Sequence, residues 1–157
     1  MLNSQTAESI VDHALSLGAD FAEIFIEKNE TNVISTLSND VQSVESGINF
    51  GIGLRLIYGT KVLYGYTNKT DREELLRIAS VLAAKDLRDP VNTSMSFNFN
   101  QIIDIHPARK ILSVDAEIES KVAYLMAADQ AARAAGKLIS QTRGSCMQRE
   151  QWIEIFN

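Results

Sequence analysis

The chain has 157 residues, of which 45% are hydrophobic and 22% charged, and this composition is typical of a globular protein and not of a disordered one. A formal net charge of −5 argues against a broad basic surface for nucleic acid, and no apolar run approaches the roughly 20 residues that cross a bilayer. Cys146 is the only cysteine, so no intramolecular disulfide can form, and the length predicts one ordinary domain.

The N-terminal segment predicts an amphipathic helix. Ser4 or Thr6 is expected to cap its start, and Gly18 to close it in the left-handed conformation. The segment lacks the basic start and the continuous apolar block of a signal peptide, which, with the single cysteine, favours a cytoplasmic protein. The apolar stripe recurs at steps of three and four residues and consists of Ala7, Ile10, Val11, Ala14 and Leu15.

From Phe21 the apolar period changes to two, which predicts β-strands. Ala22, Ile24 and Ile26 alternate with Glu23 and Glu27, whose charges we interpret as facing solvent. The segment TNVISTLSND continues in the same period, and VQSVES is a further short strand after an Asn39-Asp40 turn. These segments predict a meander of antiparallel strands.

Residues 47–68, GINFGIGLRLIYGTKVLYGYTN, contain five of the eight glycines and predict a β-hairpin. The strands GIGLRLIY and KVLYGYT are joined by Gly59-Thr60, a pair that fits a two-residue type II′ turn. This turn fixes every opposed pair along the two strands. The expected pairs are Tyr58 with Lys61, Ile57 with Val62, Leu56 with Leu63, Arg55 with Tyr64, Leu54 with Gly65 and Gly53 with Tyr66.

The glycines of this hairpin predict close aromatic packing. We expect the ring of Tyr66 to lie across Gly53, and the guanidinium of Arg55 to rest near Tyr64. The alternative is a dinucleotide-binding loop that begins at GIG. That motif needs a third glycine and the start of a helix, but Leu56 occupies the position and the strand continues through it.

Two further helices follow. TDREELLRIASVLAAKD begins with Thr70 and Glu73 at the spacing of a capping box. Residues 86–112 lack periodicity, and we expect them to be the most mobile internal segment. Ser113 is expected to cap a helix over residues 114–135 whose Ile118, Val122, Leu125 and Met126 face inward, and KLISQTRGSCMQREQWIEIFN predicts two strands around an Arg143-Gly144-Ser145 turn. The buried stripe of the second helix is Leu75, Leu76, Ile78, Ala79, Leu82 and Ala83.

The residues alone indicate no catalytic, cofactor or metal site. The two histidines, His13 and His106, share no obvious site, and a structural or catalytic zinc ion needs three or four closely spaced ligands. Asp104 and His106 could lie on one side of an extended segment, but a solvated loop pair is the favoured interpretation. Cys146 has no neighbouring histidine to activate it, so we interpret it as an inert thiol, and no G-x-S-x-G motif is present.

The order of these segments resembles the N-terminal domain of the TldD/PmbA family, the metallopeptidase-like proteins also named modulators of DNA gyrase. GADFAEIFIEK, residues 18–28, and the glycine hairpin, residues 47–68 with GIGLR and YGYTN, carry the resemblance. The hairpin is closer to the TldD side of the family than to the PmbA side. The resemblance covers essentially the whole chain and is strongest in its first half.

The resemblance implies a two-part protein whose zinc motif, of the H-E-x-x-x-H type, lies in a C-terminal domain. Residues 1–157 contain no such motif and would form the single, non-catalytic N-terminal domain. Since the chain ends inside a predicted strand, WIEIFN, we expect the natural protein to continue past Asn157. No zinc ligand can be assigned to this chain, and zinc is expected only in the C-terminal domain.

The resemblance also implies a dimer of a TldD-type and a PmbA-type subunit. The implied partners are therefore the protein's own C-terminal domain, a second subunit and a peptide substrate, without nucleic acid or membrane. Arg55, Tyr64 and Tyr66 are the candidates for contact with the peptide or the subunit interface. The predicted fold class is α+β, an antiparallel sheet of meander and hairpin packed with about three helices. The alternative function is a free-standing binding or regulatory module of the gyrase-modulator type.

Overall fold

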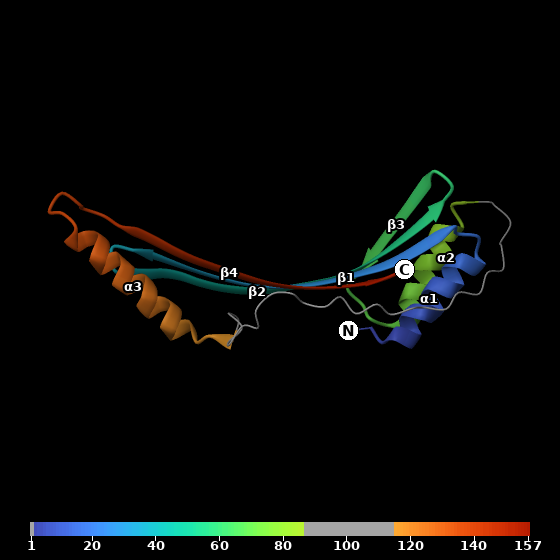
Figure 1. Cartoon of the computed structure of the whole chain (residues 1–157), viewed down its shortest axis with the longest axis horizontal. Coiled ribbons are helices and arrows are strands. Elements are labelled where there is room, and N and C mark those ends of the chain that lie inside the picture. Colours follow the sequence, from blue (N-terminus) through green and yellow to red (C-terminus); the bar gives the residue numbers. More distant parts are fainter. Residues whose placement is uncertain (1, 87–114) are drawn as a thin grey trace, which may run out of the picture. The chain divides into compact units, whose positions relative to one another are not determined.

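The computed structural model describes residues 2–86 and 115–157. Within these ranges, three helices and a four-stranded antiparallel sheet with strand order β3-β2-β1-β4 confirm the predicted α+β class (Figure 1). The segment expected to be a mobile loop lies, apart from Asp86, outside the described residues, and its mobility stays a prediction. The elements are α1 (Ser4–Ser16), β1 (Phe21–Leu37), β2 (Asp40–Tyr58), β3 (Lys61–Thr67), α2 (Arg72–Ala83), α3 (Ile118–Ala134) and β4 (Arg143–Phe156).

The described residues form two compact units. Unit 1 comprises residues 2–28, 50–86 and 152–157, and therefore α1, α2, β3 and parts of the other strands. Unit 2 comprises residues 29–49 and 115–151, and therefore α3 and the remaining parts of β1, β2 and β4.

Helix α1 buries the whole predicted stripe, from Ala7 to Leu15. Its cap differs from the prediction, because Asn3 precedes the first turn and its Oδ1 accepts a hydrogen bond from the Thr6 backbone N–H at 2.8 Å. An asparagine at this position satisfies one of the N–H groups that a helix start leaves unpaired. Gly18 has φ of 95°, which confirms the predicted left-handed conformation after the helix.

Helix α2 begins at Arg72 with Asp71 at the N-cap, and no side chain caps it, so the predicted capping box of Thr70 and Glu73 is wrong. The predicted stripe is otherwise confirmed, with Leu76 half-buried and the rest buried. Helices α1 and α2 lie side by side (Figure 1). Polar contacts join them at their surface: His13 Nε2 lies 3.0 Å from Ser80 Oγ, and Arg72 Nε donates to Ser9 Oγ at 3.0 Å.

The large hydrophobic core lies within unit 1. Alternate residues of β1 and β2 face the two helices, which explains the two-residue period of the sequence in these segments. Burying each large aliphatic side chain contributes about 1.5–3 kcal/mol to folding, so this layer is the main source of stability. The strand residues of the core are Ala22, Ile24, Ile26, Ile52, Leu54, Leu56 and Tyr58.

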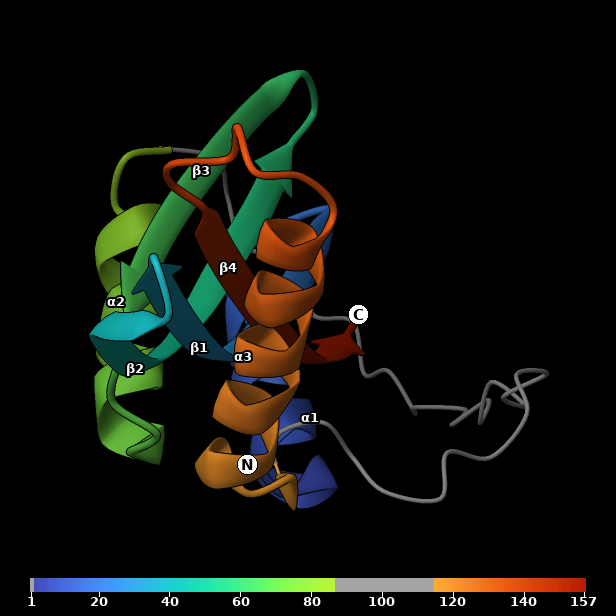
Figure 2. The same ribbon diagram turned by 90° about the vertical axis from the view of Figure 1, so that its left-hand side faces the viewer.

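Strands β2 and β3 form the predicted hairpin (Figure 2). Its register is as predicted at every opposed pair from Gly53 with Tyr66 to Tyr58 with Lys61. Gly59 has φ of 60°, as the first central residue of a type II′ turn requires. Gly65 faces α2, where an added Cβ would lie 2.8 Å from Ile78 Cγ2 and 3.4 Å from Leu82 Cδ1. A residue without a side chain at this position therefore lets the helix pack closely on the strand.

The strand boundaries differ from the prediction in two places. VQSVES and GIGLRLIY belong to one strand, β2, and the turn before it is at Ser38 and Asn39, with φ of 49° and 71°, instead of Asn39-Asp40. The C-terminal segment forms one strand, β4, and not two, because residues 143–145 begin that strand. Gly144 packs against β1, since a Cβ there would lie 2.5 Å from Thr36 Oγ1. The glycine is needed for packing and not for a turn.

Unit 2 has few buried apolar side chains. Helix α3 begins at Ile118, later than predicted, and it buries Leu125 and Asp129. The predicted cap Ser113 and residue 114 lie outside the described residues. Ile118 is 39% exposed, so the prediction that it faces inward is wrong. Asp129 Oδ1 accepts a hydrogen bond from the Thr142 hydroxyl, and Arg133 Nε lies 3.5 Å from Asp129 Oδ2. These polar contacts fix the end of α3 to the residues that precede β4.

Candidate functional site

The three predicted contact residues share one face of the β2–β3 hairpin. Because Gly65 faces α2, its neighbours Tyr64 and Tyr66 point away from the helices, and Arg55 pairs with Tyr64 across the strands. We call this surface the outer hairpin face. It consists of Gly53, Arg55, Ile57, Val62, Tyr64 and Tyr66.

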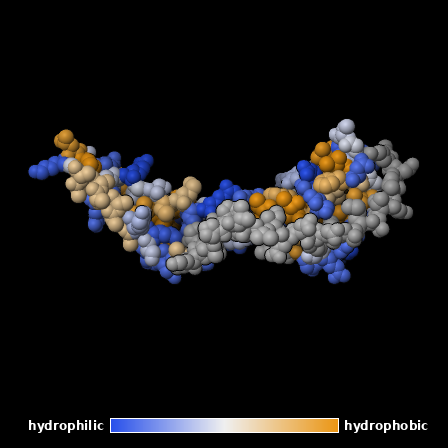
Figure 3. Space-filling model, viewed as in Figure 1, coloured by the Kyte–Doolittle hydropathy of each residue, from blue (hydrophilic) through white to orange (hydrophobic). Residues whose placement is uncertain are grey.

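The outer hairpin face is apolar and uncovered within the described part of the chain. Val62, Tyr64 and Tyr66 are 58%, 59% and 82% exposed. Hydrophobic residues reach the surface over β3 in the space-filling view (Figure 3). Exposed aromatic side chains in a group are typical of surfaces that bind another molecule.

The aromatic ring over Gly53 belongs to Tyr64, and not to Tyr66 as predicted. A Cβ at position 53 would lie 2.8 Å from Tyr64 Cζ and closer still to the phenol oxygen. Tyr64 reaches its diagonal neighbour across the strand pair, a distance that an aromatic side chain can span. Tyr66, which is directly opposite Gly53, is left exposed to solvent.

Arg55 is held by β1. Its NH2 donates to Glu23 Oε2 at 3.0 Å, and its guanidinium lies over the Phe21 ring at 5.7 Å from the centroid, whereas the sequence predicted stacking near Tyr64. Arg55 Nε has no hydrogen-bond partner. Glu23, interpreted from the sequence as a solvent-facing charge, is only 17% exposed in its side chain. The arginine is therefore oriented by neighbours that the alternating pattern of β1 did not identify as its partners.

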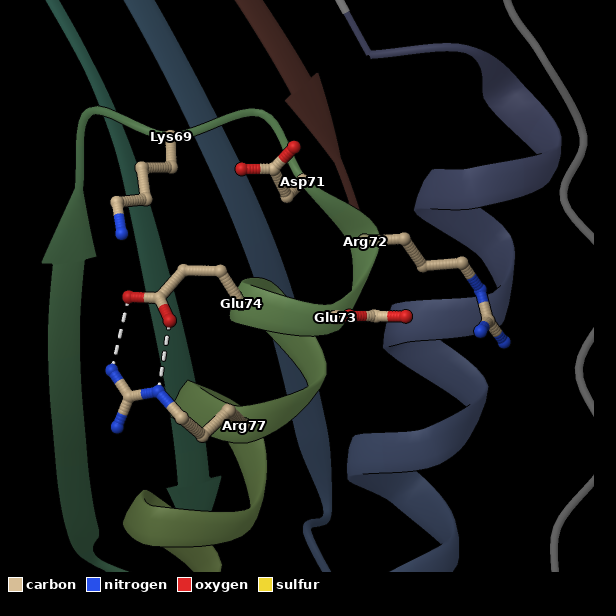
Figure 4. Close-up of a pocket in the computed structure, with 6 residues that line it drawn as sticks. All are labelled: Lys69, Asp71, Arg72, Glu73, Glu74 and Arg77. Carbon is tan, nitrogen blue, oxygen red and sulfur yellow. Dashed lines mark hydrogen bonds and ion pairs between the residues drawn. The ribbon is translucent and has the colours of Figure 1, made fainter.

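A charged groove lies at the start of α2 and was not predicted (Figure 4). Arg77 Nε and NH2 donate to the two carboxylate oxygens of Glu74 at 2.8 and 2.9 Å. This bidentate hydrogen bond lowers the pKa of Glu74 and raises the pKa of Arg77. Arg72 points to α1, where it bonds Ser9. The groove is lined by Lys69, Asp71, Arg72, Glu73, Glu74 and Arg77, and two of its three cations are thus engaged by the protein itself.

In the described ranges, no three or more His, Cys, Asp and Glu side chains are grouped so that they could hold a metal ion. His106 and Asp104 lie outside these ranges, so their pairing stays a prediction. Cys146 is a half-buried free thiol on β4. None of the helices in residues 2–86 and 115–157 is long and apolar enough to cross a membrane.

Residues 22–85 match the family model of PmbA/TldA metallopeptidase domain 1. This match confirms the resemblance predicted from the sequence, and it includes β2, β3, α2 and all but the first residue of β1. Among curated proteins, none matches the sequence significantly.

Three solved structures have a similar fold. A candidate modulator of DNA gyrase from Bacteroides thetaiotaomicron has a TM-score of 0.68 and 14% identity, over 98% of this chain and 36% of that one. TldE from Thermococcus kodakarensis has a TM-score of 0.60 and 14% identity, over 96% and 34%. A candidate gyrase modulator from Thermotoga maritima has a TM-score of 0.53 and 12% identity, over 96% and 34%. The chain thus spans about a third of the length of the structures it matches.

Proposed function

We propose, from the match of residues 22–85 to the first domain of the PmbA/TldA metallopeptidases, that this chain is the non-catalytic N-terminal domain of a TldD-like zinc metallopeptidase. In this role it shapes the peptide-binding cavity and the subunit interface, and the zinc ion and its ligands belong to a C-terminal domain. The similar structures are longer chains, which supports the presence of further domains.

The outer hairpin face carries the proposal. Tyrosine and arginine are enriched among the residues that contribute most to protein interfaces, and here Tyr64, Tyr66 and Arg55 lie together on one face of a hairpin. The Arg55 side chain is 43% exposed, so its guanidinium can donate to a carboxylate or a carbonyl of a bound chain. The surface therefore has both an apolar area and a directional polar group for a peptide or a neighbouring domain.

The first test concerns Tyr66 in the full-length protein. We expect Tyr66→Ala to weaken subunit association or peptide cleavage about fivefold, because the ring is 82% exposed and its loss leaves the core intact. Tyr124→Ala is the matched control, since this tyrosine of α3 is 78% exposed and lies outside the proposed surface. Sedimentation and cleavage rates of both variants measure the effect. Equal behaviour of the two variants would contradict a contact at the outer hairpin face.

The second test concerns zinc. The sequence offers no compact set of His, Cys, Asp and Glu ligands, so we expect purified residues 1–157 to retain no stoichiometric zinc and to cleave no peptide. Metal analysis after dialysis and a peptidase assay measure this. Tight zinc that is lost in His106→Ala or Asp104→Ala would overturn the proposal.

The coding sequence beyond codon 157 distinguishes the two functions that the sequence left open. A downstream H-E-x-x-x-H motif supports the peptidase domain. A stop codon there supports a free-standing module. Binding to DNA gyrase then becomes the activity to measure, because two of the similar structures are of candidate gyrase modulators.

A further inference from the structure

Within the described residues, one edge of the sheet is open in unit 2. Strand β2 extends from Asp40 to Tyr58, but β3 pairs with it only from Ile52 onward. The strand order places β1 on the other side of β2. Residues 40–49 of β2, which we call the β2 edge, therefore have no strand on their outer side among the described residues. The backbone N–H and C=O groups of alternate residues on such an edge are free to pair with an added strand.

The β2 edge lacks the lysine and proline residues that often protect a sheet edge. Proteins commonly protect an edge by short strands, lysine or proline. The sequence DVQSVESGIN contains no lysine, arginine or proline, and Val41, Val44 and Ile48 are 42%, 45% and 66% exposed. By contrast, β3 has seven residues and begins with Lys61, and β4 carries arginines. The β2 edge thus differs from both edge strands in that its charged residues, Asp40 and Glu45, are all acidic.

The acidic residues of the β2 edge favour a basic partner strand. Asp40 and Glu45 are exposed, and neither forms an ion pair with another described residue. Antiparallel pairing of two copies about the middle of this segment would bring the two Glu45 carboxylates close together, which is unfavourable. A strand with lysine or arginine beside apolar side chains would pair with both the carboxylates and the exposed valines.

We propose that the β2 edge binds an extended basic segment of another protein as an additional strand of the sheet. The backbone supplies most of the affinity in this mode, and the side chains of Glu45 and Asp40 supply preference for a basic sequence. This surface is separate from the outer hairpin face, and the proposal does not depend on peptidase activity.

A blocked ten-residue peptide of alternating valine and lysine is the probe. We expect it to bind the 157-residue chain, to protect amides within residues 40–49 from hydrogen exchange, and to bind less tightly as salt increases. Two further peptides are N-methylated on one or the other set of alternate amides. The peptide that is methylated on the amides facing the edge should bind at least about tenfold more weakly than the unmethylated peptide, because it lacks the N–H groups that pair with the edge. Since only the peptide is changed, the stability of the protein is not affected.

A charge reversal tests the preference. Glu45→Lys should weaken binding of the basic peptide about two- to fivefold and strengthen binding of a valine–glutamate peptide, as expected for exposed charge pairs. Asp115→Lys makes the same change in net charge at an exposed residue outside the edge and should leave binding unchanged. Equal binding of all peptides, or protection elsewhere, would overturn the proposal. Concentration-dependent self-association that protects residues 40–49 would also overturn it and assign the edge to a contact between copies.

Discussion

Replacing Gly65 by valine is expected to reduce the free energy of unfolding by about 3 kcal/mol, although valine has the better strand propensity. The added Cβ would lie 2.8 Å from Ile78 Cγ2, a methyl group that is fixed by a branched side chain on α2. The helix must therefore move away from the strand, and the buried stripe of α2 loses contact with the core. Denaturant midpoints followed by circular dichroism measure the loss.

Gly51→Val is the matched control for this substitution. The nearest atom to a Cβ at position 51 is the backbone oxygen of Thr67 at 3.9 Å, which is ordinary contact. We expect this variant to be neutral or to gain less than about 1 kcal/mol from strand propensity. An equal loss in both variants would show that valine is unfavourable anywhere in the hairpin, and that the approach of α2 is not the cause.

Replacing Gly53 by valine is expected to cost about 2 kcal/mol, because the new side chain and the Tyr64 ring require the same space. The cost is smaller than at Gly65 because the Tyr64 ring is 59% exposed and can rotate outward. If the clash causes the loss, adding Tyr64→Ala should recover part of it, since contacting residues couple non-additively.

Tyr66→Ala serves as the control in this cycle. The three atoms nearest to the Cβ position of residue 53 all belong to Tyr64, so the effect of Tyr66→Ala should add to that of Gly53→Val within about 0.5 kcal/mol. Unfolding free energies of the single and double variants give both coupling terms. Coupling to Tyr66 and not to Tyr64 would restore the arrangement expected from direct opposition of Gly53 and Tyr66.

The sequence predicts those parts of the fold that depend on local signals. The stripe of α1 follows from its three- and four-residue spacing, and the register of the hairpin follows from one turn, Gly59-Thr60, which fixes every later pair. For the same reason, Arg55 and Tyr64 are correctly predicted to be opposite each other. A type II′ turn permits no other alignment of these two strands.

The remaining features depend on side-chain rotamers and on contacts between residues far apart in the chain, which local sequence patterns do not specify. Whether Tyr64 or Tyr66 covers Gly53 is decided by side-chain rotamers, and both residues have the same place in the alternation. Arg55 is oriented by Glu23, which is 32 residues away in the chain. Gly144 has the sequence signature of a turn, but it is a glycine because Thr36 leaves no space for a side chain.

The uneven distribution of buried apolar residues has a consequence for local opening of the chain. Every member of the hydrophobic core belongs to unit 1, whereas Ile34 and Leu125 are the buried apolar residues of unit 2 within the described ranges. The free energy of local opening increases with the buried apolar contacts that must be broken. Residues 29–37 of β1 should therefore open at a lower free energy than residues 21–28. A cooperative boundary then falls inside a single continuous strand, and secondary structure alone would not locate it.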